Sequence, residues 1–106
     1  MAPLIERNRE QIVALCKRYG ITRLDVFGSA ARGTDFDEAT SDADFFYDTE
    51  RRETPEWWFD RVLDFAFQLE ELLGRRVDLV DLPRMQRRKP EFVERTEPDR
   101  RVIHVG

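Results

Sequence analysis

The sequence predicts one α/β (α+β) domain in which helices pack against a central mixed β-sheet. Two observations lead to this class. Apolar residues recur at helical spacing in two long segments, and short segments rich in β-forming residues alternate with them. The chain has 106 residues, of which 41% are hydrophobic, including eight Phe and two Trp. This length and composition fit one folded core, so a single domain over residues 1–106 is expected.

The expected elements follow from periodicity and from the residues that interrupt it. Ile12 and Cys16 belong to an apolar helical pattern that Gly20 ends. A run of β-forming residues follows and is broken at Gly28. Thr54 is the expected cap of a long later helix, which has proline at its first position. We therefore expect helices at 4–18, 30–32, 54–73 and 91–96, a loop at 34–41, and strands at 21–27, 43–47, 77–80 and 102–105.

Composition narrows the function classes. Lys and Arg total 18 against 22 Asp and Glu, and the net charge of −4 argues against strong direct nucleic-acid binding. No apolar run approaches the length of a membrane span and no secretory signal is recognisable, so we expect a cytoplasmic protein without a membrane partner. The single cysteine, Cys16, excludes an internal disulfide and is expected to be a buried structural thiol.

Three aspartates carry the chemical signal. Asp42 and Asp44 are two residues apart at an expected strand, so both side chains should lie on one face. Asp78 interrupts an otherwise apolar strand and needs a partner there. If the two strands are neighbours, the three carboxylates converge and suit Mg²⁺, or two metal ions that clamp a phosphoryl or nucleotidyl transfer. Asp81 competes for the third position, but capping the next segment is its expected role.

A Gly-Ser corner supplies the complementary half of a phosphate site. Gly28 lets the backbone approach a ligand closely, and the Ser29 hydroxyl with the following N–H groups suits a phosphate. Arg32 has two candidate roles: it adds positive charge near the phosphates, or it braces the loop through an acid such as Asp35.

These motifs together resemble the minimal nucleotidyltransferase (MNT) group of the DNA polymerase β-like superfamily. The residues that carry the resemblance are Gly28–Gly33, Ser41–Asp44 and Val77–Val80. The resemblance implies a central mixed sheet with helices on one side and the active site at its edge. It also implies that Asp42 and Asp44 hold both metals, that Asp78 completes the site, and that Gly28 and Ser29 bind the triphosphate. The acidic loop before Asp42 is longer than is common in the group.

The resemblance further implies a role as an MntA-like antitoxin of the HEPN/MNT toxin–antitoxin systems. Such antitoxins transfer AMP from ATP to a tyrosine of a HEPN ribonuclease toxin. Two alternatives stay open: a nucleotidyltransferase that modifies a small molecule such as an aminoglycoside, and a non-catalytic module that neutralises a toxin by occlusion.

Three further features are ambiguous from sequence. The sheet-facing stripe of the long helix is expected to consist of Trp58, Val62, Phe65, Leu69 and Leu72. Trp57 and Phe67 should lie away from this stripe, as a partner surface or beneath a terminal segment. The segment 84–89 carries four basic residues and is either a solvated, flexible connector or a basic rim that meets ATP or toxin-bound RNA. His104 is expected to be structural rather than catalytic.

Overall fold

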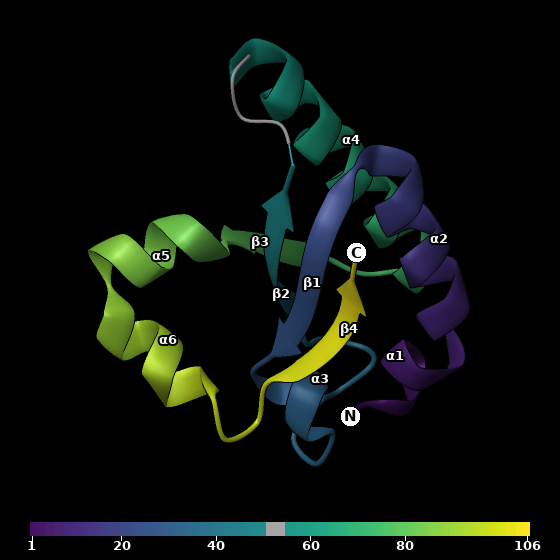
Figure 1. Cartoon of the computed structure of the whole chain (residues 1–106). Helices are drawn as coiled ribbons and strands as arrows, with labels where there is room; N and C mark the ends of the chain where they lie inside the picture. Colours follow the sequence, from purple (N-terminus) through teal and green to yellow (C-terminus); the bar gives the residue numbers. More distant parts are fainter. Residues whose placement is uncertain (51–54) are drawn as a thin grey trace.

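The chain forms a four-stranded sheet with helices on both of its faces (Figure 1). The computed structural model describes residues 1–50 and 55–106, and within the long helix it describes side chains from Trp58 onward. The elements are α1 (Pro3–Arg7), α2 (Arg9–Tyr19), β1 (Ile21–Phe27), α3 (Ser29–Arg32), β2 (Ala43–Thr49), α4 (Pro55–Leu73), β3 (Val77–Asp81), α5 (Leu82–Arg88), α6 (Pro90–Thr96) and β4 (Arg101–Val105).

The sheet is mixed, as predicted, and its strand order is β3-β2-β1-β4. Strand β1 pairs antiparallel with both β2 and β4, whereas β3 runs parallel to β2. A parallel neighbour requires a crossover connection, and α4 lies between β2 and β3 in the chain. Strand β3 is consequently an edge strand, and it lies directly beside the strand that carries Asp44.

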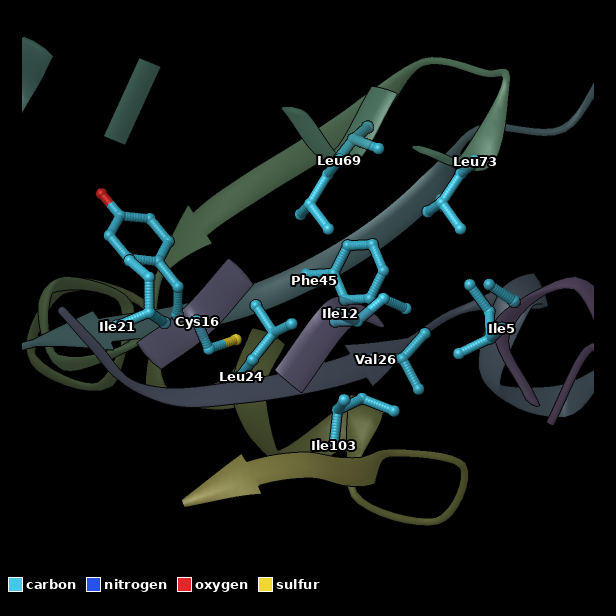
Figure 2. Packing of buried hydrophobic residues seen from close by; sticks show 14 of the residues in the cluster. Ile5, Ile12, Cys16, Ile21, Leu24, Val26, Phe45, Leu69, Leu73 and Ile103 are labelled. Atoms are coloured by element: carbon cyan, nitrogen blue, oxygen red, sulfur yellow. The ribbon is translucent and has the colours of Figure 1, made fainter. Parts of the chain in front are cut away.

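The main core lies between the sheet and helices α2 and α4. Phe45 of β2 packs among Ile12 of α2 and Leu69 and Leu73 of α4 (Figure 2). The predicted sheet-facing stripe of α4 is confirmed, because Phe65 and Leu69 are buried while the rest of the stripe is half-buried against this core. Those half-buried members are Trp58, Val62 and Leu72.

A smaller cluster covers the opposite face of the sheet. Phe27 of β1 and Phe46 of β2 stack there with their ring centroids 4.2 Å apart, and Leu82 and Val93 bring α5 and α6 against them. The expectation that all helices lie on one side is therefore wrong. Side chains alternate along a strand, so these two phenylalanines face away from α2 and α4 and need a cover of their own.

Two other local predictions differ from the structure. The single helix expected at 4–18 is divided at Asn8, whose side-chain amide donates to the carbonyl oxygen of Leu4 over 2.9 Å. Such a local side-chain hydrogen bond competes with the backbone hydrogen bonds of the helix.

The prediction of a flexible connector at 84–89 is wrong, since these residues belong largely to α5. The expected role of Asp81 as a cap is confirmed: its carboxylate accepts a hydrogen bond from the Arg84 backbone N–H over 3.1 Å at the start of α5. The expected Thr54 cap lies outside the described residues.

The predictions for the cysteine and for membrane spans can also be compared with the structure. Cys16 is buried, and burial raises the pKa of its thiol to about 12, which fits a structural thiol. Among the described residues, no helix has the length and hydrophobicity that a bilayer crossing requires.

Candidate active site at the edge of the sheet

The three predicted aspartates lie at one end of two neighbouring strands. Asp42 immediately precedes β2, Asp44 is its second residue, and Asp78 is the second residue of β3. The parallel register pairs Asp44 with Asp78, so the two strands are the neighbours that the sequence argument required. Since Phe46 follows Asp44 by two residues, Asp44 lies on the face of the sheet that carries α5 and α6.

The pKa of Asp44 is affected by both of the other aspartates. Its pKa is raised to about 6, first by burial, then by the charge of Asp78 and a side-chain hydrogen bond with it, and then by the charge of Asp42. Asp42 and Asp44 are half-buried, and Asp78 is exposed. Over the described part of the chain, no three His, Cys, Asp or Glu side chains are gathered tightly enough to hold one metal ion. The acids are therefore adjacent, but they do not form a closed ligand set.

The Gly-Ser corner lies against Asp44. Gly28 has φ 69° and ψ −150°, a conformation open essentially to glycine alone. A Cβ atom at this position would lie 3.0 Å from Oδ2 of Asp44. The Gly28 carbonyl then accepts the N–H groups of Ala31 and Arg32, which begins α3 at Ser29. The close approach that we expected for a ligand is thus already made by a carboxylate of the site.

Arg32 braces the acidic loop, which is the second of the two roles considered for it. Its guanidinium donates to the Asp35 carboxylate at 2.8 Å and to the Asp99 carboxylate at 3.3 Å. These bonds raise the pKa of Arg32 and lower that of Asp35. Arg32 therefore ties the acidic loop to the segment before β4, and a phosphate would have to replace one of these carboxylates to engage it.

The loop that delivers Asp42 is anchored by Arg75, which the sequence argument did not single out. The Arg75 guanidinium donates to the carbonyl oxygen of Ser41 and lies 5.3 Å from the centre of the Phe36 ring. Within the loop, the Asp37 backbone N–H donates to Oγ of Ser41 over 2.9 Å. Nothing in the sequence distinguishes Arg75 from its neighbour Arg76, so this anchor was not predictable.

A buried acid behind the site was also missed. Asp25 of β1 is completely buried and accepts two hydrogen bonds of 3.0 Å from the Arg23 guanidinium. Nε of Arg100 lies 3.4 Å from the same carboxylate. The sequence contains a partial signal for this pair: Asp25 is the one acid of the strand over 21–27, and Arg23 lies two residues before it on the same face.

A groove lies between the long helix α4 and the edge strand β3. A cavity of about 520 Å³ lies between α4 and β3, where Val62 and Leu63 face Leu79 across it. Asp78 and Arg84 also line this cavity. One wall of the groove is therefore apolar, and the groove extends along the edge strand to the position of Asp78.

A mixed sheet that presents adjacent aspartates beside a glycine corner at one edge is the architecture of a nucleotidyl-transferring domain. The sequence supports this class independently. Residues 9–103 match the nucleotidyltransferase domain family, and the chain belongs to that family. A search of curated proteins found no significant match.

Solved structures agree with this assignment. A structure described as a minimal nucleotidyltransferase is 31% identical, with a TM-score of 0.71, and the match covers 92% of this chain and 90% of that one. A toxin–antitoxin structure with AMP-PNP is 20% identical, with a TM-score of 0.66 and coverage of 93% and 74%. A mutant of the toxin–antitoxin MntA-HpeT is 20% identical, with a TM-score of 0.65 and coverage of 93% and 73%. The last two similarities establish a shared fold.

Proposed function

We propose that this nucleotidyltransferase is an Mg²⁺-dependent antitoxin that transfers AMP from ATP to a tyrosine of a HEPN ribonuclease toxin. The observation that carries the chemistry is the pairing of Asp44 with Asp78 on parallel strands, with the Gly28 corner pressed against Asp44. The toxin–antitoxin assignment is supported by the family resemblance and by the fold shared with toxin–antitoxin structures, one of them determined with AMP-PNP.

The donor set fits a hard divalent cation. All three side chains offer carboxylate oxygens, which are the ligands that Mg²⁺ prefers. Burial, and after it the negative charges of Asp78 and Asp42, raise the pKa of Asp44, and a bound cation would neutralise those charges. Asp42 and Asp44 would hold the metal and Asp78 would complete its ligands. When bound, the cation would neutralise phosphate charge and support departure of the leaving oxygen.

The residues of the chain have separate roles in the transfer. Gly28 and Ser29 would receive the triphosphate, through the close backbone approach at Gly28 and the hydroxyl of Ser29. Asp78 is exposed at the sheet edge, so it can take the proton of an arriving tyrosine hydroxyl. The tyrosine oxygen then forms a bond to the α-phosphorus, the bond from that phosphorus to the bridging oxygen breaks, and pyrophosphate leaves with that electron pair.

Transfer of label tests the proposal. The protein is incubated with α-³²P-ATP, Mg²⁺ and a co-expressed HEPN toxin. Wild type should label that protein, and Asp42→Asn should not. Glu94→Gln, an exposed change on α6, serves as the matched control and should label normally. Labelling by Asp42→Asn at the wild-type rate would refute the metal assignment.

The alternatives give different results. If Asp42→Asn combined with Asp44→Asn still protects cells from the toxin, neutralisation by occlusion replaces transfer. If expression of the wild type raises aminoglycoside resistance without labelling a protein, a small-molecule acceptor replaces the toxin.

A further inference from the structure

The long helix has a second apolar stripe that faces solvent. Phe59, Leu63 and Phe67 are 56%, 53% and 54% exposed. Residues four apart lie on one face of a helix, so these three side chains form a row about two turns long. Of the two side chains expected to lie away from the sheet, Phe67 is confirmed and Trp57 lies outside the described side chains. We call the row Phe59, Leu63 and Phe67 the α4 stripe.

The α4 stripe continues into the groove that ends at Asp78. Phe59 and Leu63 line the cavity between α4 and β3, and Leu79 of β3 lines its other side. Because β3 is the edge strand, this apolar surface lies at the margin of the sheet and not beneath another strand. A segment seated on the α4 stripe would have its neighbouring residues beside Asp78.

The charged residues around the α4 stripe indicate the net charge of a partner that would bind there. Asp60, Asp64 and Glu71 are exposed on α4 next to the stripe. The one basic side chain of α4 between residues 58 and 73, Arg61, donates to the carbonyl oxygens of Arg18 and Tyr19 and is directed toward the end of α2. Asp64 also accepts the Tyr19 hydroxyl over 2.7 Å, which leaves Asp60 and Glu71 as the acids directed to solvent. Among the described residues that line the groove, Asp78 and Asp81 outnumber the single basic residue, Arg84. The border of the stripe is therefore acidic on balance.

This border excludes two occupants on electrostatic grounds. A second copy of the chain would bring the same acids to the interface, and like charges brought together are costly. An anionic lipid surface would meet the same repulsion. An apolar row with two turns of anchor positions and an acidic border fits a basic amphipathic helix, which places its own apolar residues in a groove.

We propose that the α4 stripe and the adjoining groove dock a basic amphipathic helix of a partner protein. The docked helix holds the acceptor segment at the edge strand β3, where Asp78 is exposed. This second statement rests on the proposed function, whereas the docking itself requires neither nucleotide nor metal.

The experiment uses two designed peptides of about 18 residues, long enough for five turns. Both carry Leu at positions i, i+3, i+4 and i+7, and the remaining positions are Lys in one and Glu in the other. Fluorescence anisotropy measures binding of each labelled peptide to the intact chain. The stripe variant combines Leu63→Gln with Phe67→Gln. The control combines Val102→Gln with Val105→Gln, which are exposed apolar residues on β4 at the opposite edge of the sheet.

The Lys peptide should bind wild type and the control equally, and the stripe variant should bind it at least about tenfold more weakly. A charge variant, Asp60→Lys with Glu71→Lys, should weaken the Lys peptide by a similar factor and improve the Glu peptide. The charge variant keeps the apolar stripe, so it tests the proposal even if the stripe variant fails to fold.

Two results would overturn the proposal. One is equal affinity of the Lys peptide for wild type and the stripe variant. The other is a dimer of the wild type in light scattering that the stripe variant dissolves, which would assign the stripe to a second copy. Asp42→Asn should bind the Lys peptide like wild type, so failure of the chemistry and failure of docking are separable.

Discussion

Replacing Asp44 with asparagine should stabilise the metal-free protein at neutral pH and remove most of its response to Mg²⁺. The folded state raises the pKa of Asp44 from its ordinary 3.8 to about 6, because burial and the charges of Asp78 and Asp42 oppose ionisation. The folded protein therefore binds this proton more tightly than the unfolded chain does. Stability is lost as the pH rises from 3.8 through about 6, and the loss is complete at neutral pH.

The size of the effect follows from the same pKa. A rise from 3.8 to about 6 corresponds to at most about 3 kcal/mol of lost stability. Asp44 is only half-buried, and solvent screening brings the expected loss to about 1 kcal/mol. Asparagine carries no charge, so Asp44→Asn should recover that amount, which is about 4–8 °C in melting temperature for a domain of this size.

Thermal unfolding followed by circular dichroism in EDTA measures this gain. Asp44→Asn should melt above wild type at about pH 7.5 and close to it at about pH 4.5, where the wild-type carboxyl is protonated. Mg²⁺ should then raise the melting temperature of wild type and change that of Asp44→Asn little, because ligands that bind the folded state stabilise it. Glu94→Gln should behave like wild type in every condition. A metal-free Asp44→Asn that melts below wild type at neutral pH would refute the electrostatic argument.

Three structural predictions accompany it, each measured by urea denaturation. Gly28→Ala should cost about 2–3 kcal/mol, because it forces a side chain into a glycine conformation and against Asp44. Gly20→Ala, whose added Cβ would meet nothing within 4 Å, should cost about 1 kcal/mol, and equal losses would contradict the contact with Asp44. Asp81→Ala should cost about 1 kcal/mol through loss of the α5 cap, and Asp81→Asn clearly less; no difference between them would argue against the cap. Asp25→Asn should cost about 3 kcal/mol by leaving two arginines without their buried carboxylate, and a loss below about 1 kcal/mol would show that water replaces it.

The regular elements could be predicted because local patterns determine them. The strand over Ile21–Phe27 has the predicted bounds, and α4 ends at Leu73, the residue at which the long helix was predicted to end. The break at Asn8 depends on one side-chain bond to a backbone carbonyl, and an apolar period does not reveal such a bond. The position of α5 and α6 depends on Phe27 and Phe46, whose alternation was visible although their need for a separate cover was not recognised.

The candidate site was predictable to the extent that strand order brings residues together. The acidic pair, the lone strand acid and the glycine corner could each be read from the chain, and the parallel pairing of β2 with β3 unites them. The contacts that fix the approach to Asp42 were not predictable. Arg75 reaches Ser41 across more than thirty residues of sequence, and Arg32 reaches Asp99 across a longer distance still. Such long-range pairs depend on the tertiary fold, which the local pattern of charges does not encode.

Asp25 and Asp78 differ in how their negative charge is balanced, and this difference distinguishes a structural carboxylate from a candidate active-site carboxylate. Both are acids within strands, but Arg23 lies two residues before Asp25 on the same face, whereas the strand that contains Asp78 has no basic residue. The structure gives Asp25 two guanidinium partners and buries it completely, so its negative charge is balanced within the protein. Asp78 is exposed and lies beside Asp44, so its nearest acidic neighbour adds to the negative charge. A folded protein rarely keeps adjacent carboxylates without a cation or a shared proton. In the metal-free protein a proton shared between Asp44 and Asp78 fits the raised pKa of Asp44, and this pair is where the proposed function places the cation.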